Sequence, residues 1–245
     1  MIVRNTNQGW HVVYQAAHGL LAGTIAHHLK REMRPKAWME TWVAVTEHDD
    51  HQLDFNEKDY LSQLGTPIDF MENQVPKEKA VERARRIYHR SRAKSAWTAL
   101  MVYLHLDFLY GDMDHQGMRS FLDSLKETVH PVCDLYGASP EEAKAAYQLV
   151  RFCDRLSLIL CQEQVPGRGR ALEINAALSK KTSIVMELEN GDLTVAPWCF
   201  ERDRVELSVE FRVLRQATFE GNKALQKALG AAKVERKHWA LQKAD

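Results

Sequence analysis

Four residues of this chain carry side chains that bind divalent metal ions, and each lies in a segment with a helical pattern. His48 and Asp49 are adjacent in the sequence. His18 lies 30 residues before His48, and Asp154 lies far downstream. Imidazoles and carboxylates together suit first-row transition metals such as Mn, Fe, Co and Ni, and a metal with an open position can hold water. These four residues are therefore candidate ligands of a divalent transition metal.

Asp49 and Asp154 each continue the apolar face of a predicted helix. Trp38, Trp42 and Val45 precede Asp49 at helical spacing. The matching stripe around Asp154 is formed by Tyr147, Val150, Leu158 and Cys161. An inward-facing carboxylate is costly unless it is paired, hydrogen-bonded or bound to a metal. One metal would satisfy both carboxylates, and the alternative is two separate structural contacts, such as an ion pair with Arg.

The candidate catalytic residues are Asp49, Asp54 and His105. His105 could bind a second metal, donate to phosphate or pack against the neighbouring Trp97. Asp54 lies five residues beyond Asp49 and could act as an acid or base, or be only a carboxylate at a helix C-terminus. His18 also has a structural alternative, as a histidine of the core or of a helix start.

A run of positive charge occupies the segment 83–94. Its members are Arg83, Arg85, Arg86, Arg90, Arg92 and Lys94. Such a face could attract a phosphorylated substrate, because Arg binds phosphate through charge-assisted hydrogen bonds. The more common alternative is a helix face exposed to solvent.

The overall composition is that of an ordinary globular protein without a strong charge. The chain has 245 residues, of which 45% are hydrophobic and 27% are charged, and Lys+Arg and Asp+Glu both number 33. A net charge near zero gives no reason to expect binding to nucleic acid or to an anionic membrane. No apolar stretch approaches the ~18 residues that cross a bilayer, and the N-terminus lacks the apolar core of a signal peptide. We therefore expect a soluble, cytoplasmic protein.

Cysteine spacing and the absence of several motifs exclude other classes of protein. Cys133, Cys153, Cys161 and Cys199 form no CxxC pair, so reduced and mostly buried thiols are expected. The sequence contains no P-loop, GxGxxG or GxSxG motif and no zinc-type Cys/His cluster. Nucleotide-binding, α/β-hydrolase and zinc-finger folds therefore lose their usual support.

Hydrophobic periodicity and turn residues predict the elements that must position the candidate ligands. A hairpin is expected at the N-terminus, a second hairpin at 184–196, and an alternating, half-buried strand at 205–213. Helices are expected at 16–33, at 36–53, at 77–110 as two helices or one bent helix, from 114 to about 131, and from Pro140 onwards after a capping box at Ser139.

These elements predict an α+β fold that is mainly α. The helices would form the core, and the N-terminal hairpin and the C-terminal strands would join in one small antiparallel sheet. Residues 1–220 are expected to make a single domain. Residues 221–245, which are rich in Lys and Ala, are expected to form a helical or partly disordered tail.

Several short stretches resemble an uncharacterised bacterial family of about this length, known only as a domain of unknown function. They are Met1-Ile2-Val3-Arg4, Gln15-Ala16-Ala17-His18, Glu47-His48-Asp49 and Phe152-Cys153-Asp154-Arg155-Leu156-Ser157-Leu158, with Leu21, Gly23, Ala26, His28 and His105 between them. That family is similar to the HD superfamily of metal-dependent phosphohydrolases, in which the order His…His-Asp…Asp recurs on helices. The resemblance implies an HD-like helical core with a metal bound by His18, His48, Asp49 and Asp154.

One departure from the HD pattern bears on activity. Many HD hydrolases carry a catalytic Glu three residues after the His-Asp pair, and Gln52 occupies that place here. His51-Gln52 also stands where the resembling family often has Gly-Trp. A metal site could thus be kept while its chemistry is altered or lost.

Two functions of different classes follow. The first is a metal-dependent phosphohydrolase acting on a small phosphorylated molecule such as a nucleotide, and the four-residue ligand set favours it. The second is a non-enzymatic module that senses a ligand or binds a partner protein, and Gln52 favours it. The expected partner is a small phosphorylated substrate or ligand, with no nucleic acid and no membrane. A homodimer is compatible with the sequence.

Overall fold

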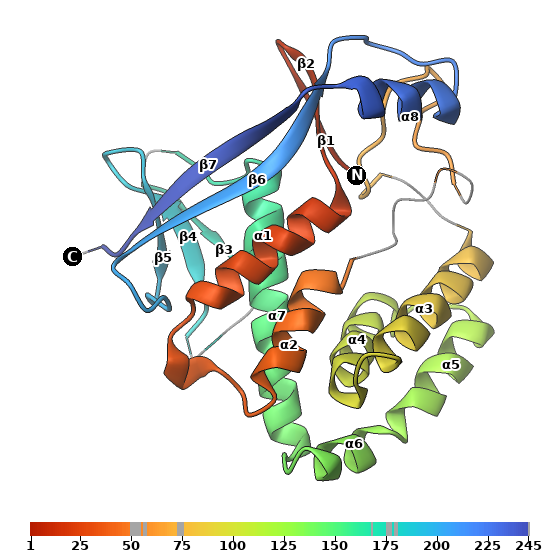
Figure 1. The fold of residues 1–245 in the computed structure, drawn as a ribbon, viewed down its shortest axis with the longest axis vertical. Coiled ribbons are helices and arrows are strands. Elements are labelled where there is room, and N and C mark those ends of the chain that lie inside the picture. The colour runs from red at the N-terminus through yellow and green to blue at the C-terminus, as the bar shows by residue number, and fades with distance from the viewer. Residues whose placement is uncertain are drawn as a thin grey trace.

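The computed structural model shows a helical layer joined to a seven-stranded sheet (Figure 1). It describes residues 1–49, 55, 58–72, 76–167, 169–174, 178 and 181–244. The helices are α1 (Gln15–His28), η1 (Arg31–Met33, a 3-10 turn), α2 (Trp38–Glu47), α3 (Lys77–Arg92), α4 (Ala96–Tyr110), α5 (Gln116–Lys126), α6 (Val129–Leu135), α7 (Pro140–Cys161) and α8 (Asn222–Ala231). The strands are β1 (Ile2–Thr6), β2 (Gly9–Val13), β3 (Ala171–Glu173), β4 (Ile184–Glu187), β5 (Leu193–Ala196), β6 (Arg204–Leu214) and β7 (Val234–Gln242).

The sheet has the strand order β1-β2-β6-β7-β5-β4-β3. Neighbouring strands pair antiparallel, except that β5 and β7 run parallel where Leu193 meets Leu241. The N-terminal hairpin and the C-terminal strands therefore share one sheet, as the sequence predicted. The prediction that this sheet would be small and antiparallel throughout was wrong.

Strand β7 accounts for much of the difference. The sequence predicted a helical or partly disordered tail at 221–245, and the structure has the helix α8 followed by strand β7, which pairs along its full length with β6. Leu241 is the only buried residue of β7. The segment therefore lacks the alternation of apolar and polar residues that identifies β6, and ladder hydrogen bonds to β6 hold it in the sheet.

Helix α1 occupies the centre of the molecule. It packs against β6 on one side and against α2 and α7 on the other, and helices α3 to α6 lie farther from the sheet (Figure 1). The candidate ligands His18 and Asp154 lie on α1 and α7, so contact between these two helices positions them. None of the helices in the described part of the chain is long and apolar enough to cross a membrane.

Two helix boundaries differ from, or refine, the sequence prediction. Helix α1 ends at His28 and does not continue through the predicted range 16–33, because Leu29 leaves the helix to form a β-bridge with Phe200. The predicted segment 77–110 is two helices, and the hydroxyl of Ser95 accepts a hydrogen bond from the Thr98 amide at the start of the second.

The predicted capping box begins α7, the longest helix. The Ser139 hydroxyl accepts from the Glu142 amide, and the Glu142 carboxylate accepts from the Ser139 amide. Pro140 occupies the first helical position, where its missing amide hydrogen costs nothing. This start fixes the helical register that turns Asp154 inward, four turns later.

Two glycines of α1 allow α2 to approach it closely. A Cβ on Gly19 would lie 2.4 Å from the carbonyl oxygen of Thr46, and one on Gly23 would lie 2.4 Å from the Thr46 hydroxyl. The Trp42 indole donates to the carbonyl oxygen of Gly23 over 2.7 Å. This close approach holds His18 and the end of α2 together.

Gly19→Ala tests the close contact between α1 and α2. The added methyl group meets backbone, so we expect the free energy of unfolding to fall by about 1–3 kcal/mol, the usual cost of overpacking. Gly230→Ala is the matched control, because a Cβ at this position in α8 meets nothing within 4 Å. Alanine there should leave stability unchanged or raise it by about 0.5–1 kcal/mol. Equal melting temperatures for wild type and Gly19→Ala would contradict the packing argument.

Candidate metal centre

The four candidate ligands meet at one buried point between α1, α2 and α7. The Nε2 atom of His18 lies 3.3 Å from Oδ2 of Asp49 and 3.5 Å from Oδ1 of Asp154. The Nε2 atom of His48 lies 3.1 Å from Oδ1 of Asp154 and 3.9 Å from Oδ2 of Asp49. His18 and His48 are fully or almost fully buried. The structure thus brings together residues that are more than 100 positions apart in sequence.

The hydrogen bonds around His18 assign its tautomer. The Ser157 hydroxyl donates to the main-chain oxygen of Asp154 over 2.8 Å, so its oxygen accepts the 2.7 Å hydrogen bond from Nδ1–H of His18. The Nε2 atom of a neutral His18 therefore carries a lone pair. That atom is buried and has no hydrogen-bond partner within the described residues, although two carboxylates lie close to it.

His48, at the end of α2, also has its Nδ1 engaged as a donor. Its Nδ1–H donates to the carbonyl oxygen of Val45 over 2.7 Å, and its Nε2 faces the carboxylate of Asp154. Lone pairs and carboxylate oxygens repel one another unless a cation lies between them. A histidine whose second nitrogen donates to a carbonyl or hydroxyl oxygen is the usual form of a metal ligand. The donor set therefore fits a divalent metal.

His105 belongs to the same cluster. Its ring stands edge-on to that of His48, with ring centroids 5.2 Å apart, and its Nδ1 lies 3.3 Å from the Tyr147 hydroxyl. Two sets of residues place their ligand atoms within 4.8 Å of one another: His18, His48 and Asp49, and His48, His105 and Asp154. The structure thus brings His105 within reach of a metal or of a substrate bound at one.

Two residues that the sequence did not single out complete the surroundings of the cluster. Gln15 donates from Nε2 to Oδ2 of Asp49 over 3.0 Å, and Ser157 holds His18 as described above. Each lies three positions from a candidate ligand on the same helix, so each shares that ligand's face. A polar residue three positions from a candidate ligand was the sequence signal that could have identified Gln15 and Ser157. The predicted acid or base Asp54 and the departure at Gln52 lie outside the described residues.

Charge interactions within the cluster displace the pKa values of its members. Burial alone would lower the pKa of His48, but the carboxylates of Asp154 and Asp49 outweigh it and raise the pKa to about 9. Burial would raise the pKa values of both carboxyl groups, but His48 and the other imidazoles hold them below the ordinary range. Burial and the neighbouring His48 lower the pKa of His105 to about 4. Without metal, a proton on His48 is therefore the counter-charge of the carboxylates.

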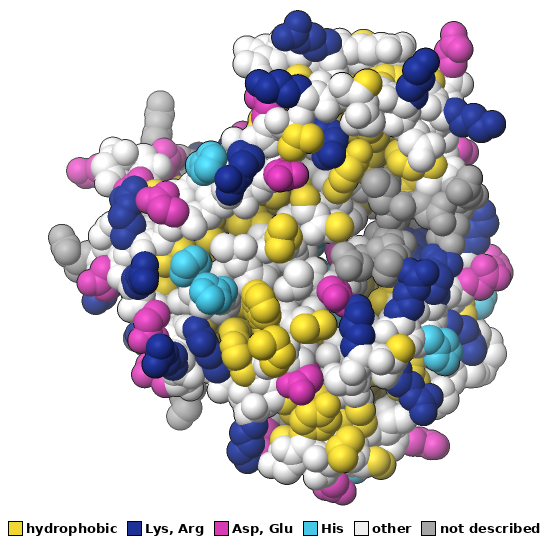
Figure 2. Space-filling model, viewed as in Figure 1, with side chains coloured by type: hydrophobic (Ala, Val, Ile, Leu, Met, Phe, Trp, Pro, Cys, Tyr) yellow, Lys and Arg dark blue, Asp and Glu magenta, His cyan; other side chains and the backbone are white. Residues whose placement is uncertain are grey.

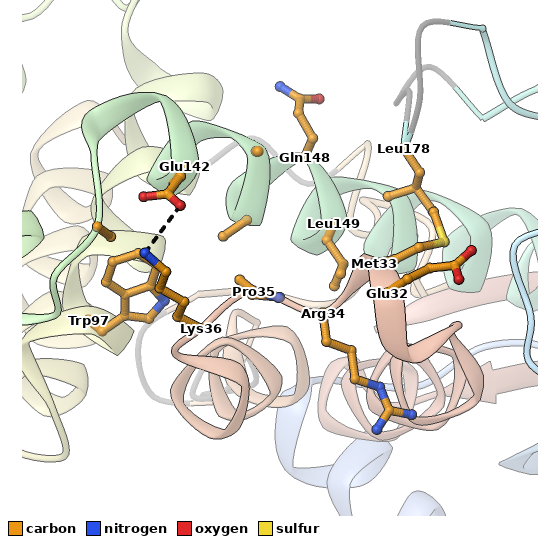
Figure 3. A pocket seen from close by; sticks show the side chains of 13 residues that line it. Glu32, Met33, Arg34, Pro35, Lys36, Trp97, Glu142, Gln148, Leu149 and Leu178 are labelled. Carbon is orange, nitrogen blue, oxygen red and sulfur yellow. Dashed lines mark ion pairs between the residues drawn. The ribbon is translucent and has the colours of Figure 1, made fainter.

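A cavity of about 300 Å³ opens from the cluster. It is lined at the cluster by Asp49, His105 and Asp154, and farther along by residues that include Lys58 and Arg83. A second cavity of about 530 Å³ has walls from η1, α4 and α7, and an ion pair between Lys36 and Glu142 lies at its side (Figure 3). None of the four candidate ligands lines this second cavity. Of these two cavities, the first is the one that reaches the cluster.

The raised pKa of His48 predicts an alkaline loss of stability in chelator-treated protein. A folded-state pKa of about 9 against an ordinary 6.5 corresponds to on the order of 3 kcal/mol. This stabilisation is complete below pH 6.5 and disappears as the pH rises through 9. The melting temperature of wild type should fall across this window, and that of His48→Gln should fall much less. His27→Gln, which changes an exposed imidazole of α1, is the control and should behave as wild type. Parallel pH profiles for wild type and His48→Gln would contradict the proton assignment.

Comparison with known proteins gives one match. Residues 1–216 match the model of a family described as a protein of unknown function, DUF3891. No curated protein and no solved structure matches the chain significantly. The matched segment contains all four candidate ligands, His105 and Ser157. Because the match covers most of its length, the chain belongs to the DUF3891 family of proteins of unknown function.

Proposed function

We propose that this protein is a metal-dependent phosphohydrolase of the HD type, acting on a small phosphorylated molecule. His18, His48, Asp49 and Asp154 would be the ligands of a divalent transition metal such as Mn, Fe, Co or Ni. One observation carries the proposal: two buried Nε2 atoms, whose other ring nitrogens are engaged as donors, converge with two carboxylates. The placement of these ligands on α1, α7 and the end of α2 supports an HD-like helical core.

A divalent metal at these ligands supplies a Lewis acid and lowers the pKa of a bound water molecule. The protein's own groups would do the rest. The carboxylates of Asp49 and Asp154 provide negative charge, and Gln15 fixes the orientation of the first. His105 lines the cavity, where its imidazole would handle a proton or donate a hydrogen bond to a phosphoryl oxygen.

Measurement of metal content together with phosphoesterase activity tests this proposal. Purified protein reconstituted with Mn or Co should retain about one or two ions per chain and should hydrolyse at least one member of a set of nucleotides and sugar phosphates. Asp49→Asn should abolish hydrolysis while the circular dichroism spectrum is unchanged. Asp123→Asn, which changes an exposed carboxylate of α5, is the matched control and should retain full activity.

Two outcomes would contradict the proposal in different ways. Failure to retain Mn, Fe, Co or Ni would exclude the metal site and leave the carboxylates as structurally paired groups. Retention of metal without turnover of any phosphoester would exclude the hydrolase and favour the non-enzymatic module. Loss of activity in both Asp49→Asn and Asp123→Asn would show that the assay responds to folding and not to the site.

Ser157→Ala tests how the protein prepares His18 for the metal. Without the hydroxyl, the His18 proton is free to move from Nδ1 to Nε2, and Nε2 then has no lone pair for a metal. We expect Mn or Co affinity, measured by competition with a chromophoric chelator, to fall about 10- to 100-fold. Ser124→Ala is the matched control, because that hydroxyl also donates to the main-chain oxygen three residues earlier. Equal affinities in the two variants would refute the role of Ser157.

A further inference from the structure

Arg83 stands apart from the other cations of its helix. Six Lys and Arg side chains occupy the segment 83–94, and Lys and Arg side chains gather on the surface around α3 (Figure 2). Arg83 is 8% exposed, whereas the others are exposed or half-buried. The sequence predicted the whole face as a candidate for attracting phosphate. The structure places one member of it, Arg83, in the wall of the cavity that opens from the metal cluster.

Arg83 is buried, and one N–H donor of its guanidinium has no acceptor among the described residues. Its Nε is inaccessible to solvent and has no hydrogen-bond partner among the residues that the structure describes. Arg83 also forms no ion pair with a carboxylate of those residues. A guanidinium is always charged, and a buried N–H donor without an acceptor is costly. Arg83 lines a cavity, and an anion that enters this cavity would supply the missing acceptor.

The cavity that Arg83 lines is the one that opens from the metal cluster. Asp49, His105 and Asp154 line it, together with Arg83 from α3 and Tyr110 from α4. Its volume of about 300 Å³ lies at the lower end of the range for small-molecule sites. An anionic group in this space can therefore face the metal ligands and the guanidinium at once.

We propose that Arg83 binds the phosphoryl group of the substrate in this cavity, opposite the metal ligands. The inference rests on the proposed function and adds to it a binding residue and a substrate class, a compact phosphoester with a terminal phosphoryl group. The guanidinium presents parallel N–H donors that match two phosphate oxygens. Those oxygens supply the acceptor that Nε–H lacks among the described residues. Arg83 thereby separates phosphorylated molecules from uncharged ones of the same size.

Binding of inorganic phosphate tests this assignment without an enzyme assay. Wild type, Arg83→Gln, Arg83→Lys and Arg90→Gln are loaded with Mn, freed of unbound metal, and titrated with phosphate in a calorimeter. Metal content and circular dichroism are measured on the same samples. Arg90 is the matched control, because it lies two turns farther along α3 and is exposed.

The expected result is selective loss of phosphate affinity. Arg83→Gln should weaken phosphate binding about 10- to 100-fold at unchanged metal content, the usual effect of removing a charge-assisted hydrogen bond. Arg83→Lys keeps the charge without the paired donors and should lie between Arg83→Gln and wild type. Arg90→Gln should stay within about twofold of wild type, because exposed charges contribute little.

Two results would overturn the assignment. The first is equal phosphate affinity in wild type, Arg83→Gln and Arg90→Gln. The second is metal-loaded wild type that binds no phosphate. Absence of metal from every sample would instead contradict the proposed function. The same titration of metal-free wild type and Arg83→Gln would then decide the role of Arg83, since weaker binding by the variant supports it and equal binding refutes it.

Discussion

Two carboxylates and two imidazole lone pairs converge inside the helical layer, and this arrangement requires a positive charge at its centre. Asp154 is hydrogen-bonded to His48, and Asp49 accepts a hydrogen bond from Gln15. In the metal-free protein a proton on His48 meets this requirement, as the raised pKa of that residue indicates. A divalent metal meets it for all four groups. The position of α1 between the sheet, α2 and α7 brings together ligands from three separate segments.

The fold keeps these segments in place by close packing and by hydrogen bonds at short range. Gly19 and Gly23 let α2 approach α1, and Ser157 links His18 to the backbone of α7. The sheet supports α1 from behind through β6, the strand that also pairs with β2 and β7.

The sequence was sufficient to predict the parts of the site that helical periodicity governs. Asp49 and Asp154 were identified because a carboxylate on an apolar stripe is unusual, and the Ser139 capping box fixed the start of α7. Strand β7 could not be predicted, because a strand held by its neighbours needs no apolar alternation. Arg83 could not be separated from the other cations of α3, since the rotation of that helix against α4 and α5 decides which side chain reaches the cavity. Such rotations depend on packing between distant segments.

Anomalous diffraction from crystals of the protein grown with Mn or Co would test the central claim most directly. The account predicts a strong peak, recorded at the absorption edge of the added metal, within coordination distance of His18, His48, Asp49 and Asp154. It predicts that Nδ1 of His18 remains hydrogen-bonded to Ser157 in that crystal. A peak only at other residues, or none at the cluster with the metal present in excess, would contradict the account.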